Sequence, residues 1–188
     1  MIRLTNNYFI DGDTTYIKIK RKNGQTYTAM IDTEDLAKVS KFTWYLVGCS
    51  RKLYVGTVKR YGKKKKTIRL HRYIVGEIPE GKFIDHIDGN PLNNKKSNLR
   101  IVSNSENQQN LSPQIFRNTL SGIRGVTWNK QHKKWQAQVK IHGKKFNLGY
   151  FDDKFEAGNC VSEFRRRHMP FSEMDKKVVG LEEPNHDA

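Results

Sequence analysis

The sequence predicts an α+β protein built from several small modules, and three observations lead to this fold class. Only 36% of the 188 residues are hydrophobic, which is too few for one large core. Short alternating stretches bounded by Gly and Asn turns recur along the chain and predict hairpins. Helix signals are limited to a few capped segments. We expect a β-rich module at 1–68, a strand-loop-strand-helix unit at 69–112, a linker at 113–121, a sheet-and-helix module at 122–172 and a tail at 173–188.

The first module begins with a predicted hairpin. Tyr16–Lys20 alternates, Asn23-Gly24 is a strong hairpin turn, and Tyr27–Ile31 can return as the partner strand, with Ile17 and Ile19 facing the core. A short helix is expected at Asp35–Lys41, capped by Asp32 or Thr33, with Leu36 and Val39 on one face. A strand around Phe42–Val47 follows, and its Trp44 is expected in the core.

A second hairpin in this module carries a run of lysines. Leu53–Arg60 and Thr67–Leu70 are its predicted strands, and Tyr61–Lys66 is its loop. The four lysines Lys63, Lys64, Lys65 and Lys66 are candidates for contact with a nucleic-acid backbone, and a solvated loop is the alternative.

The stretch Ile84–Asn110 concentrates the residues that can carry chemistry. Asp85 and His86 end a short apolar strand, Asp88-Gly89-Asn90-Pro91 supplies a turn, and Leu99–Val102 is a second strand. Ser103 and Glu106 form a capping box, which places Asn107 in the first turns of a helix that Pro113 ends. A helix packed on its own hairpin can bring Asp85, His86 and Asn107 together.

These three residue types suit the hydrolysis of a phosphodiester bond. Carboxylate and amide oxygens are hard ligands that suit Mg²⁺, and a neutral imidazole can deprotonate water. Taken singly, an Asp-His pair beside a turn is more often a hydrogen-bonded loop feature than a site. The joint pattern of acid, histidine, asparagine-rich loop and capped helix favours the nuclease interpretation.

The segments DHIDGN, SNLR and SENQQN resemble the HNH nuclease motif of phage and intron homing endonucleases in order and spacing. The resemblance implies that His86 is the general base, that Asp85 and Asn107 are metal ligands, and that Asn98 braces the loop. The last histidine of the motif's name is Asn107 here, which favours Mg²⁺ or Mn²⁺ over Zn²⁺.

Leu70–Glu77, with the sequence LHRYIVGE, resembles the element that precedes the hairpin in this family. His71 either packs and hydrogen-bonds against the hairpin or approaches the scissile phosphate from a second shell. Arg72 is a candidate phosphate contact.

The C-terminal module is predicted as a three-stranded sheet under a helix. Its strands are Gly125–Trp128, Trp135–Ile141 and Lys145–Phe151, and Asp152 or Asp153 caps a helix with Ala157, Cys160, Val161 and Phe164 at helical spacing. In the middle strand the residues from Trp135 to Ile141 alternate, so Gln136, Gln138 and Lys140 share the face away from the helix.

This module resembles the APETALA-type DNA-binding domain of plant ethylene-response factors, through GVTW, the KKWQAQV alternation and the LGYF ending. The resemblance implies that the sheet enters the DNA major groove. Candidate contacts are Arg124, Trp128, Lys134, Trp135, Gln136, Gln138, Lys140 and Lys145. Core packing is the alternative for both tryptophans, and a solvated face is the alternative for the lysines. The run Arg165–Arg167 is either solvent-exposed or a further phosphate contact.

The charge of the chain indicates a polyanionic partner. Thirty-five Lys and Arg against 19 Asp and Glu give a formal net charge of +16, which a ribosomal or membrane-surface protein would share. Two cysteines without metal-ligand spacing predict neither disulfides nor a zinc site. With no signal peptide and no membrane span in the sequence, we expect a soluble intracellular protein, in the host cytoplasm if phage-encoded.

The sequence therefore predicts a Mg²⁺-dependent or Mn²⁺-dependent endonuclease that cleaves double-stranded DNA at a preferred site, with no small-molecule cofactor. Homing is what the resemblance implies. One alternative is a non-catalytic DNA-binding regulator on an HNH-like scaffold, which the intact Asp85, His86 and Asn107 disfavour. Another is a basic RNA-binding protein, which a sheet suited to the DNA major groove disfavours, since A-form RNA hides that groove.

Overall fold

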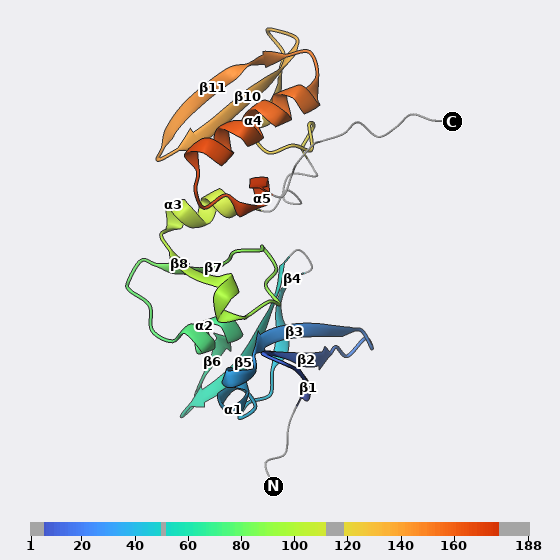
Figure 1. Ribbon diagram of the computed structural model, residues 1–188, viewed down its shortest axis with the longest axis vertical. Helices are drawn as coiled ribbons and strands as arrows, with labels where there is room; N and C mark the ends of the chain where they lie inside the picture. The colour runs from blue at the N-terminus through green and yellow to red at the C-terminus, as the bar shows by residue number, and fades with distance from the viewer. Residues whose placement is uncertain (1–5, 50–51, 112–118, 177–188) are drawn as a thin grey trace, which may run out of the picture. The chain divides into compact units, whose positions relative to one another are not determined.

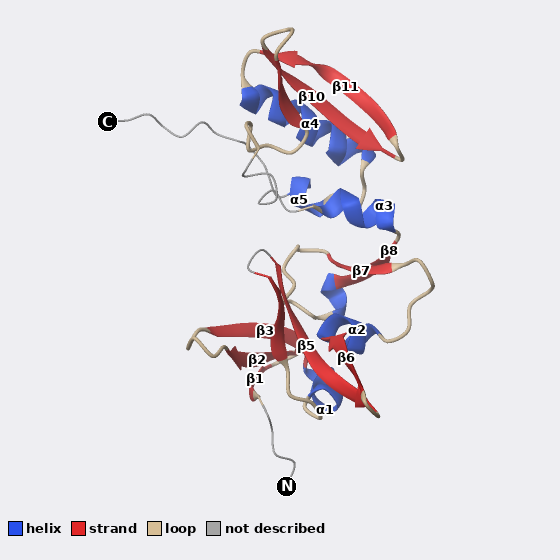
Figure 2. Cartoon of the chain, turned by 180° about the vertical axis from the view of Figure 1, so that it is seen from behind, coloured by secondary structure: helices blue, strands red, loops and turns tan. Residues whose placement is uncertain are grey.

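The computed structural model describes residues 6–49, 52–111 and 119–176. The chain divides into two compact units, residues 1–103 and 104–188, which are described separately below. Small antiparallel sheets and a few helices make up the described residues (Figures 1 and 2), in agreement with the predicted mixture of α and β structure. Of the predicted tail at 173–188 the structure describes Glu173–Lys176, which form the short helix α5. The rest of the tail and most of the predicted linker lie outside the described residues. No helix in the described ranges is long and apolar enough to cross a membrane.

The first unit contains two three-stranded sheets and a two-stranded hairpin. The first sheet has the order β1 (Asn7–Asp11), β2 (Thr14–Lys20) and β3 (Thr26–Asp32). The second has the order β4 (Tyr45–Cys49), β5 (Lys52–Tyr61) and β6 (Lys64–Arg69). Strands β7 (Phe83–His86) and β8 (Leu99–Val102) form the hairpin. The helical segments are η1 (Thr33–Asp35), α1 (Leu36–Val39), α2 (Leu70–Val75) and η2 (Lys96–Asn98).

The predicted turn at Asn23-Gly24 is confirmed. Gly24 has a φ of 87°, and its N–H donates to the Arg21 carbonyl at 3.0 Å, closing the β2–β3 hairpin. Ile17 and Ile19 are buried as expected. Strand β1 was not predicted, because four of its five residues are exposed and it has no apolar alternation. The predicted helix at Asp35–Lys41 is shorter, with one 3₁₀ turn before the four residues of α1.

The lysine run does not form a loop, which corrects the prediction for Lys63–Lys66. Tyr61 pairs with Lys64, so the turn contains only Gly62 and Lys63. Lys64, Lys65 and Lys66 belong to β6 and are exposed. They alternate between the two faces of the strand, so they cannot all meet one phosphate backbone from the same side.

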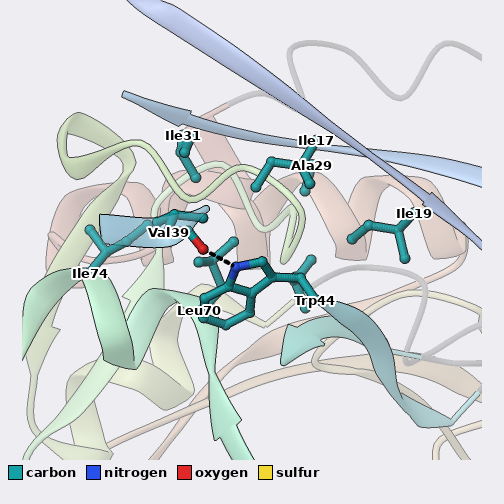
Figure 3. Close-up of a cluster of buried hydrophobic side chains, with 9 residues drawn as sticks. Ile17, Ile19, Ala29, Ile31, Val39, Trp44, Leu70 and Ile74 are labelled. Carbon is teal, nitrogen blue, oxygen red and sulfur yellow. Dashed lines mark hydrogen bonds between the residues drawn. The ribbon is translucent and has the colours of Figure 1, made fainter. Parts of the chain in front are cut away.

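One hydrophobic core joins the elements of the first unit (Figure 3). Trp44 is fully buried, and its indole N–H donates to the Val39 carbonyl at 2.8 Å. The side chains around it come from β2, β3, α1, β5 and α2, namely Ile17, Ile19, Ala29, Ile31, Val39, Val55, Leu70 and Ile74. Leu92 and Leu99, from the loop and hairpin that follow, pack against the same cluster. The core therefore crosses residue 68, where the sequence predicted a module boundary.

The second unit contains a three-stranded sheet covered by a helix. The sheet order is β11 (Lys144–Phe151), β10 (Lys134–Ile141) and β9 (Val126–Asn129). The helical segments are α3 (Asn104–Asn107), η3 (Gln108–Asn110), α4 (Lys154–His168) and α5 (Glu173–Lys176). Asp153 caps α4 by accepting from the N–H groups of Phe155 and Glu156 at 2.7 and 2.9 Å.

The core of this unit lies between the sheet and α4, as the alternation and helical spacing predicted. It comprises Val126, Ala137, Val139, Ala157, Val161 and Met169. Gly125 is placed tightly against it with a φ of 83°, and a Cβ at this position would come within 2.7 Å of the Gln138 carbonyl oxygen. A glycine is therefore required where the chain enters β9.

We expect Trp44→Ala to lower the free energy of unfolding of the first unit by about 3–5 kcal/mol, since it removes a large buried side chain and leaves a cavity. Urea denaturation of the full chain, followed by hydrogen exchange in peptides of β2 and β3, measures this loss. Trp128→Ala is the matched control, because Trp128 is 40% exposed and lies in the other unit. Equal losses for the two variants would contradict the assignment of Trp44 as the centre of this core.

Candidate functional site

The β7–β8 hairpin positions Asp85 and His86 at the end of a short strand. Asp85 pairs with Arg100 and His86 with Leu99 in an antiparallel register. Asp85 is 8% exposed and His86 is 5% exposed. Successive side chains leave a strand on opposite faces, so these two neighbours have separate surroundings.

Arg100 holds the Asp85 carboxylate. Its Nε and Nη2 atoms both donate to Asp85 Oδ2, at 3.0 and 2.8 Å. Directly opposed cross-strand residues share a face, which brings these two side chains together. Both hydrogen bonds go to one carboxylate oxygen, and carboxylate oxygens are hard ligands of the kind that Mg²⁺ prefers.

His86 lies in a cluster of aromatic rings. Its ring centroid is 5.0 Å from that of His71 in an edge-on arrangement, and 6.2 Å from that of Tyr54. Arg69 in turn lies over the Tyr54 ring at 4.5 Å. Of the two alternatives for His71, the packing of a buried ring from α2 against His86 is the one that the geometry favours.

Asn94 places an amide oxygen beside the His86 ring. Its amide Nδ2 donates to the carbonyls of Leu92 and Pro91, at 3.0 and 3.4 Å, which turns its Oδ1 toward His86 Nε2 at 3.5 Å. An acceptor beside Nε2 favours the tautomer with the hydrogen on that atom. Asn94 is fully buried, which keeps this orientation fixed.

The loop between the two strands is braced by Asn98. Its Nδ2 donates to Asp88 Oδ1 and to the Asn93 carbonyl, both at 2.9 Å, and its Oδ1 accepts from the Asp88 N–H at 3.0 Å. Asp88 also accepts from the Asn90 N–H and from Asn93 Nδ2, each at 2.8 Å. The backbone of this loop is therefore held by hydrogen bonds from asparagine and aspartate side chains, where a strand would be held by its backbone pairing.

The same loop is anchored to the first sheet. Met30 of β3 donates to the Leu92 carbonyl at 2.8 Å and accepts from the Asn94 N–H at 2.7 Å. The Lys96 N–H donates to Asp32 Oδ2 at 2.7 Å, and its ammonium group pairs with Glu34 at 2.6 Å. The N-terminal sheet thus supports the loop that carries Asn98.

Three carboxylates of this anchor, Asp32, Glu34 and Asp35, bring their oxygens within 4.8 Å of one another, as the donors of a metal site do. Lys38 pairs with Asp35 at 2.8 Å, and Lys96 pairs with Asp35 at 3.1 Å as well as with Glu34. The two ammonium groups compensate the cluster, so we interpret it as an ion-pair network that holds the loop.

Asn107 closes the helical segment α3, which belongs to the second unit. The helix predicted after Ser103 is confirmed, although it is short and ends in the 3₁₀ turn η3. Asp85 and His86 belong to the first unit, so the meeting of the three residues stays a prediction. The oxygen donors of Asp85 and Asn107 fit Mg²⁺ or Mn²⁺ in chemical type.

The uncovered face of the C-terminal sheet carries amides and hydroxyls. Gln136 Nε2 lies 3.4 Å from Asn147 Oδ1 and 3.5 Å from the Tyr150 hydroxyl, and Gln138 Nε2 donates to Thr127 Oγ1 at 3.3 Å. Lys140 pairs across the strands with Lys145, and both are exposed. This face offers donors and acceptors of the kinds that read base edges, with cations at one end.

Some predicted contacts lie elsewhere. Trp128 stands directly opposite Trp135, with ring centroids 5.1 Å apart, on the face that α4 covers, so packing is the favoured role for both. Lys134 is paired with Asp152 at 2.9 Å. Arg72 of α2 is exposed. The DNA contacts of these residues stay predictions.

Two arginines of the second unit have structural partners that the sequence did not reveal. Arg165 is 4% exposed and donates to both carboxylate oxygens of Asp175, at 2.9 and 2.7 Å, so the expectation of an exposed or phosphate-binding residue is wrong for it. Arg166 and Arg167 are exposed and pair with Glu163. Arg124 donates to the carbonyls of Gln108 and Gln109, which uses its guanidinium group within the protein.

Sequence reasoning missed Tyr54, Asn94 and Arg100. Arg100 could have been found, because pairing the two short strands from Asp85 outward places it opposite that acid. Tyr54 could not, since it reaches His71 and His86 only through the packing of β5 against α2.

Parts of this chain are similar in sequence to known proteins. Residues 68–109 match the model of a family described as HNH endonuclease. Protein 3.8 of Escherichia phage T7 is 37% identical over 88 residues, which cover 47% of this chain and 71% of that protein. Uncharacterized HNH endonuclease L560 of Acanthamoeba polyphaga mimivirus is 32% identical over 130 residues, covering 66% of this chain and 63% of that protein.

A third relative, YosQ from the SPbeta prophage of Bacillus subtilis (strain 168), has a name that assigns it provisionally to the HNH homing endonucleases. It is 53% identical over 36 residues, covering 19% of this chain and 21% of that protein. The chain thus spans less than two thirds of the second and third relatives. No solved structure gives a significant match. The chain carries an HNH endonuclease domain and belongs to the same protein family as protein 3.8 of Escherichia phage T7.

Proposed function

We propose that this protein is a metal-dependent endonuclease that hydrolyses double-stranded DNA at a preferred site, and that its biological role is homing. The observation that carries the proposal is the buried Asp85-His86 pair at the end of β7. Arg100 holds its acid, and its imidazole lies against His71 and Asn94. A loop that needed only to turn the chain would not require two buried ionisable side chains with separate partners.

In the proposed reaction His86 accepts a proton from water as the water oxygen bonds to phosphorus. The bond from phosphorus to the leaving oxygen breaks, and that oxygen takes a proton from solvent water, to which His86 later returns the proton that it accepted. Asp85 and Asn107 would hold the metal ion, which when bound supplies stabilisation of negative charge on the phosphate and the leaving oxygen. Asn94 orients the base, and Asn98 keeps the loop closed beneath it.

The basic charge of the chain and the amide-rich sheet face support DNA as the substrate. Gln136, Gln138 and Lys140 would read base edges, whereas lysines such as Lys145, Lys64 and Lys66 would contact phosphates. Incubation of the purified chain with supercoiled plasmid, with Mg²⁺ and then with EDTA, tests the activity. Cleavage in the presence of EDTA would show that the reaction does not need a metal ion. Absence of cleavage under all conditions would favour a DNA-binding regulator.

We expect His86→Ala to lower the cleavage rate by roughly 10²–10⁴-fold with DNA affinity nearly unchanged, since the imidazole acts on water and contributes little to holding phosphate. Single-turnover cleavage and a binding titration in the absence of metal measure the two quantities. His168→Ala is the control, because this histidine is exposed on α4. A variant that keeps more than about a tenth of the rate would show that another group is the base.

Asp85→Asn and Asn107→Ala are expected to raise the Mg²⁺ concentration needed for half-maximal cleavage, with the larger effect at Asp85, because it carries the charge. Asparagine at position 85 keeps an acceptor for Arg100, whereas alanine would leave a half-buried arginine without its carboxylate. Cleavage rates across a Mg²⁺ titration check this, with thermal unfolding as the control for folding. If both variants show wild-type titrations, the two residues are not the ligands.

The double variant Gln136→Ala with Gln138→Ala should broaden the choice of cleavage sites on a long DNA, because these side chains offer groups to base edges. Lys145→Ala should instead flatten the plot of log affinity against log salt, by roughly 0.9, the value for one phosphate that is no longer neutralised. Cleavage maps and salt titrations compare them with Lys22→Ala, an exposed lysine of the first unit. An unchanged map and slope would show that this sheet is not the DNA-binding face.

A further inference from the structure

The segment that carries Asn107 is too short to be stable by itself. It consists of four α-helical residues, Asn104–Asn107, followed by three 3₁₀ residues, Gln108–Asn110. Isolated helices shorter than about 12–15 residues are marginal in water, because nucleation costs more than a few hydrogen bonds return. The order of this segment must therefore come from tertiary partners.

Arg124 supplies the first of these partners. Its Nη1 and Nη2 atoms donate to the carbonyls of Gln109 and Gln108, both at 2.7 Å. The last carbonyls of a helix have no partner within the helix, and the partial negative charge there attracts a cation. Burial and the nearby Arg165 lower the pKa of Arg124 to about 10, so it remains a cation at neutral pH.

The arginine is itself held in place. The Arg124 carbonyl accepts from Arg165 Nη1 at 3.1 Å, and the next residue, Gly125, sits where a Cβ would collide with Gln138. Arg165 is fixed in turn by its two hydrogen bonds to the buried Asp175. The guanidinium group of Arg124 therefore acts from a rigid frame formed by β9, β10 and α4.

Gln109 supplies the second connection. Its side-chain Oε1 accepts from the Phe171 N–H at 3.2 Å, and its carbonyl oxygen lies 3.0 Å from Ser172 Oγ. Ser172 also contacts the Asp175 carboxylate and has one hydroxyl hydrogen, so it donates to one of the two at a time. Gln109 is 6% exposed and Ser172 is fully buried. Both views of the chain draw α3 beside α5, the helix that Ser172 precedes (Figures 1 and 2).

We propose that Arg124 is a positioning residue for the nuclease, which together with Gln109 and Ser172 holds the α3–η3 segment, and hence Asn107, on the C-terminal module. This module then sets the cleavage rate as well as the choice of site. The inference rests on the proposed function for the role of Asn107. A fragment that ended near Ser121 would keep Asn107 but lose both Arg124 and Ser172.

The test uses the full chain and three variants, Arg124→Ala, Arg124→Lys and Ser172→Ala, with Arg21→Ala as control. Arg21 stacks on Tyr27 in the first unit and has no part in the site. Hydrogen exchange of a peptide covering residues 104–111 is measured without metal, and cleavage, DNA affinity and Mg²⁺ titrations are measured beside it.

We expect Arg124→Ala to speed exchange in this peptide and to lower the cleavage rate by roughly 10-fold to 100-fold, as for other misplacements of about 1 Å, with DNA affinity changed by less than about threefold. Lysine keeps a cation that can reach one carbonyl, so Arg124→Lys should restore part of both signals. Ser172→Ala should give a smaller change in the same direction. Because it weakens the same segment at another position, it tests the proposal even if Arg124→Ala fails to fold.

Unchanged exchange in both Arg124→Ala and Ser172→Ala overturns the proposal. A parallel loss of DNA affinity and cleavage, with exchange unchanged, also overturns it and makes Arg124 the DNA contact that the sequence predicted. Normal cleavage by Arg124→Ala while Asn107→Ala is inactive rejects the positioning role alone. Normal cleavage by both variants rejects the proposed role of Asn107 instead.

Discussion

The buried Asp85-His86 pair depends on a hairpin that would not be stable by itself. Strands β7 and β8 pair over only four positions, and an isolated two-stranded hairpin is at best marginally stable in water. Its stability comes from the core around Trp44, to which Leu92 and Leu99 contribute, and from the backbone bonds of Met30 to the adjoining loop. The N-terminal sheet is therefore part of the support of the site, and the placement of Asp85 and His86 is a property of the whole first unit.

The buried polar side chains near this hairpin also depend on partners elsewhere in the first unit. Asp85, His86, Asn94 and Asn98 each lie under 10% exposed, and for each the structure gives a specific partner. Unsatisfied groups of this kind would cost about 1–3 kcal/mol each, so the hairpin and its loop tolerate them only because each has a partner. These bonds restrain the hairpin and its loop, as the roles proposed for Asp85 and His86 require.

In the second unit, too, a short segment is stabilised by tertiary contacts. A seven-residue helical segment gains its order from Arg124 and Ser172, as the hairpin does from the sheet. The boundary between the two compact units falls after Ser103, within the segment that matches the HNH family. The family motif and the compact unit therefore have different boundaries in this chain. A motif is defined by the order of residues in the sequence, whereas a compact unit is defined by contacts in the structure.

The sequence by itself determined what depends on neighbours along the chain. The turn at Asn23-Gly24, the cap at Asp153, the alternation of β10 and the adjacent Asp85 and His86 all followed from local rules, and the structure contains each of them. Only the tertiary structure decided that Arg100 holds Asp85, that Tyr54 and His71 surround His86, and that Arg124 and Arg165 are used inside the protein. The residues next to an arginine in the sequence do not show whether it will be exposed or will form a buried ion pair. Its role is set by residues 10 to 41 positions away, which local propensity cannot predict.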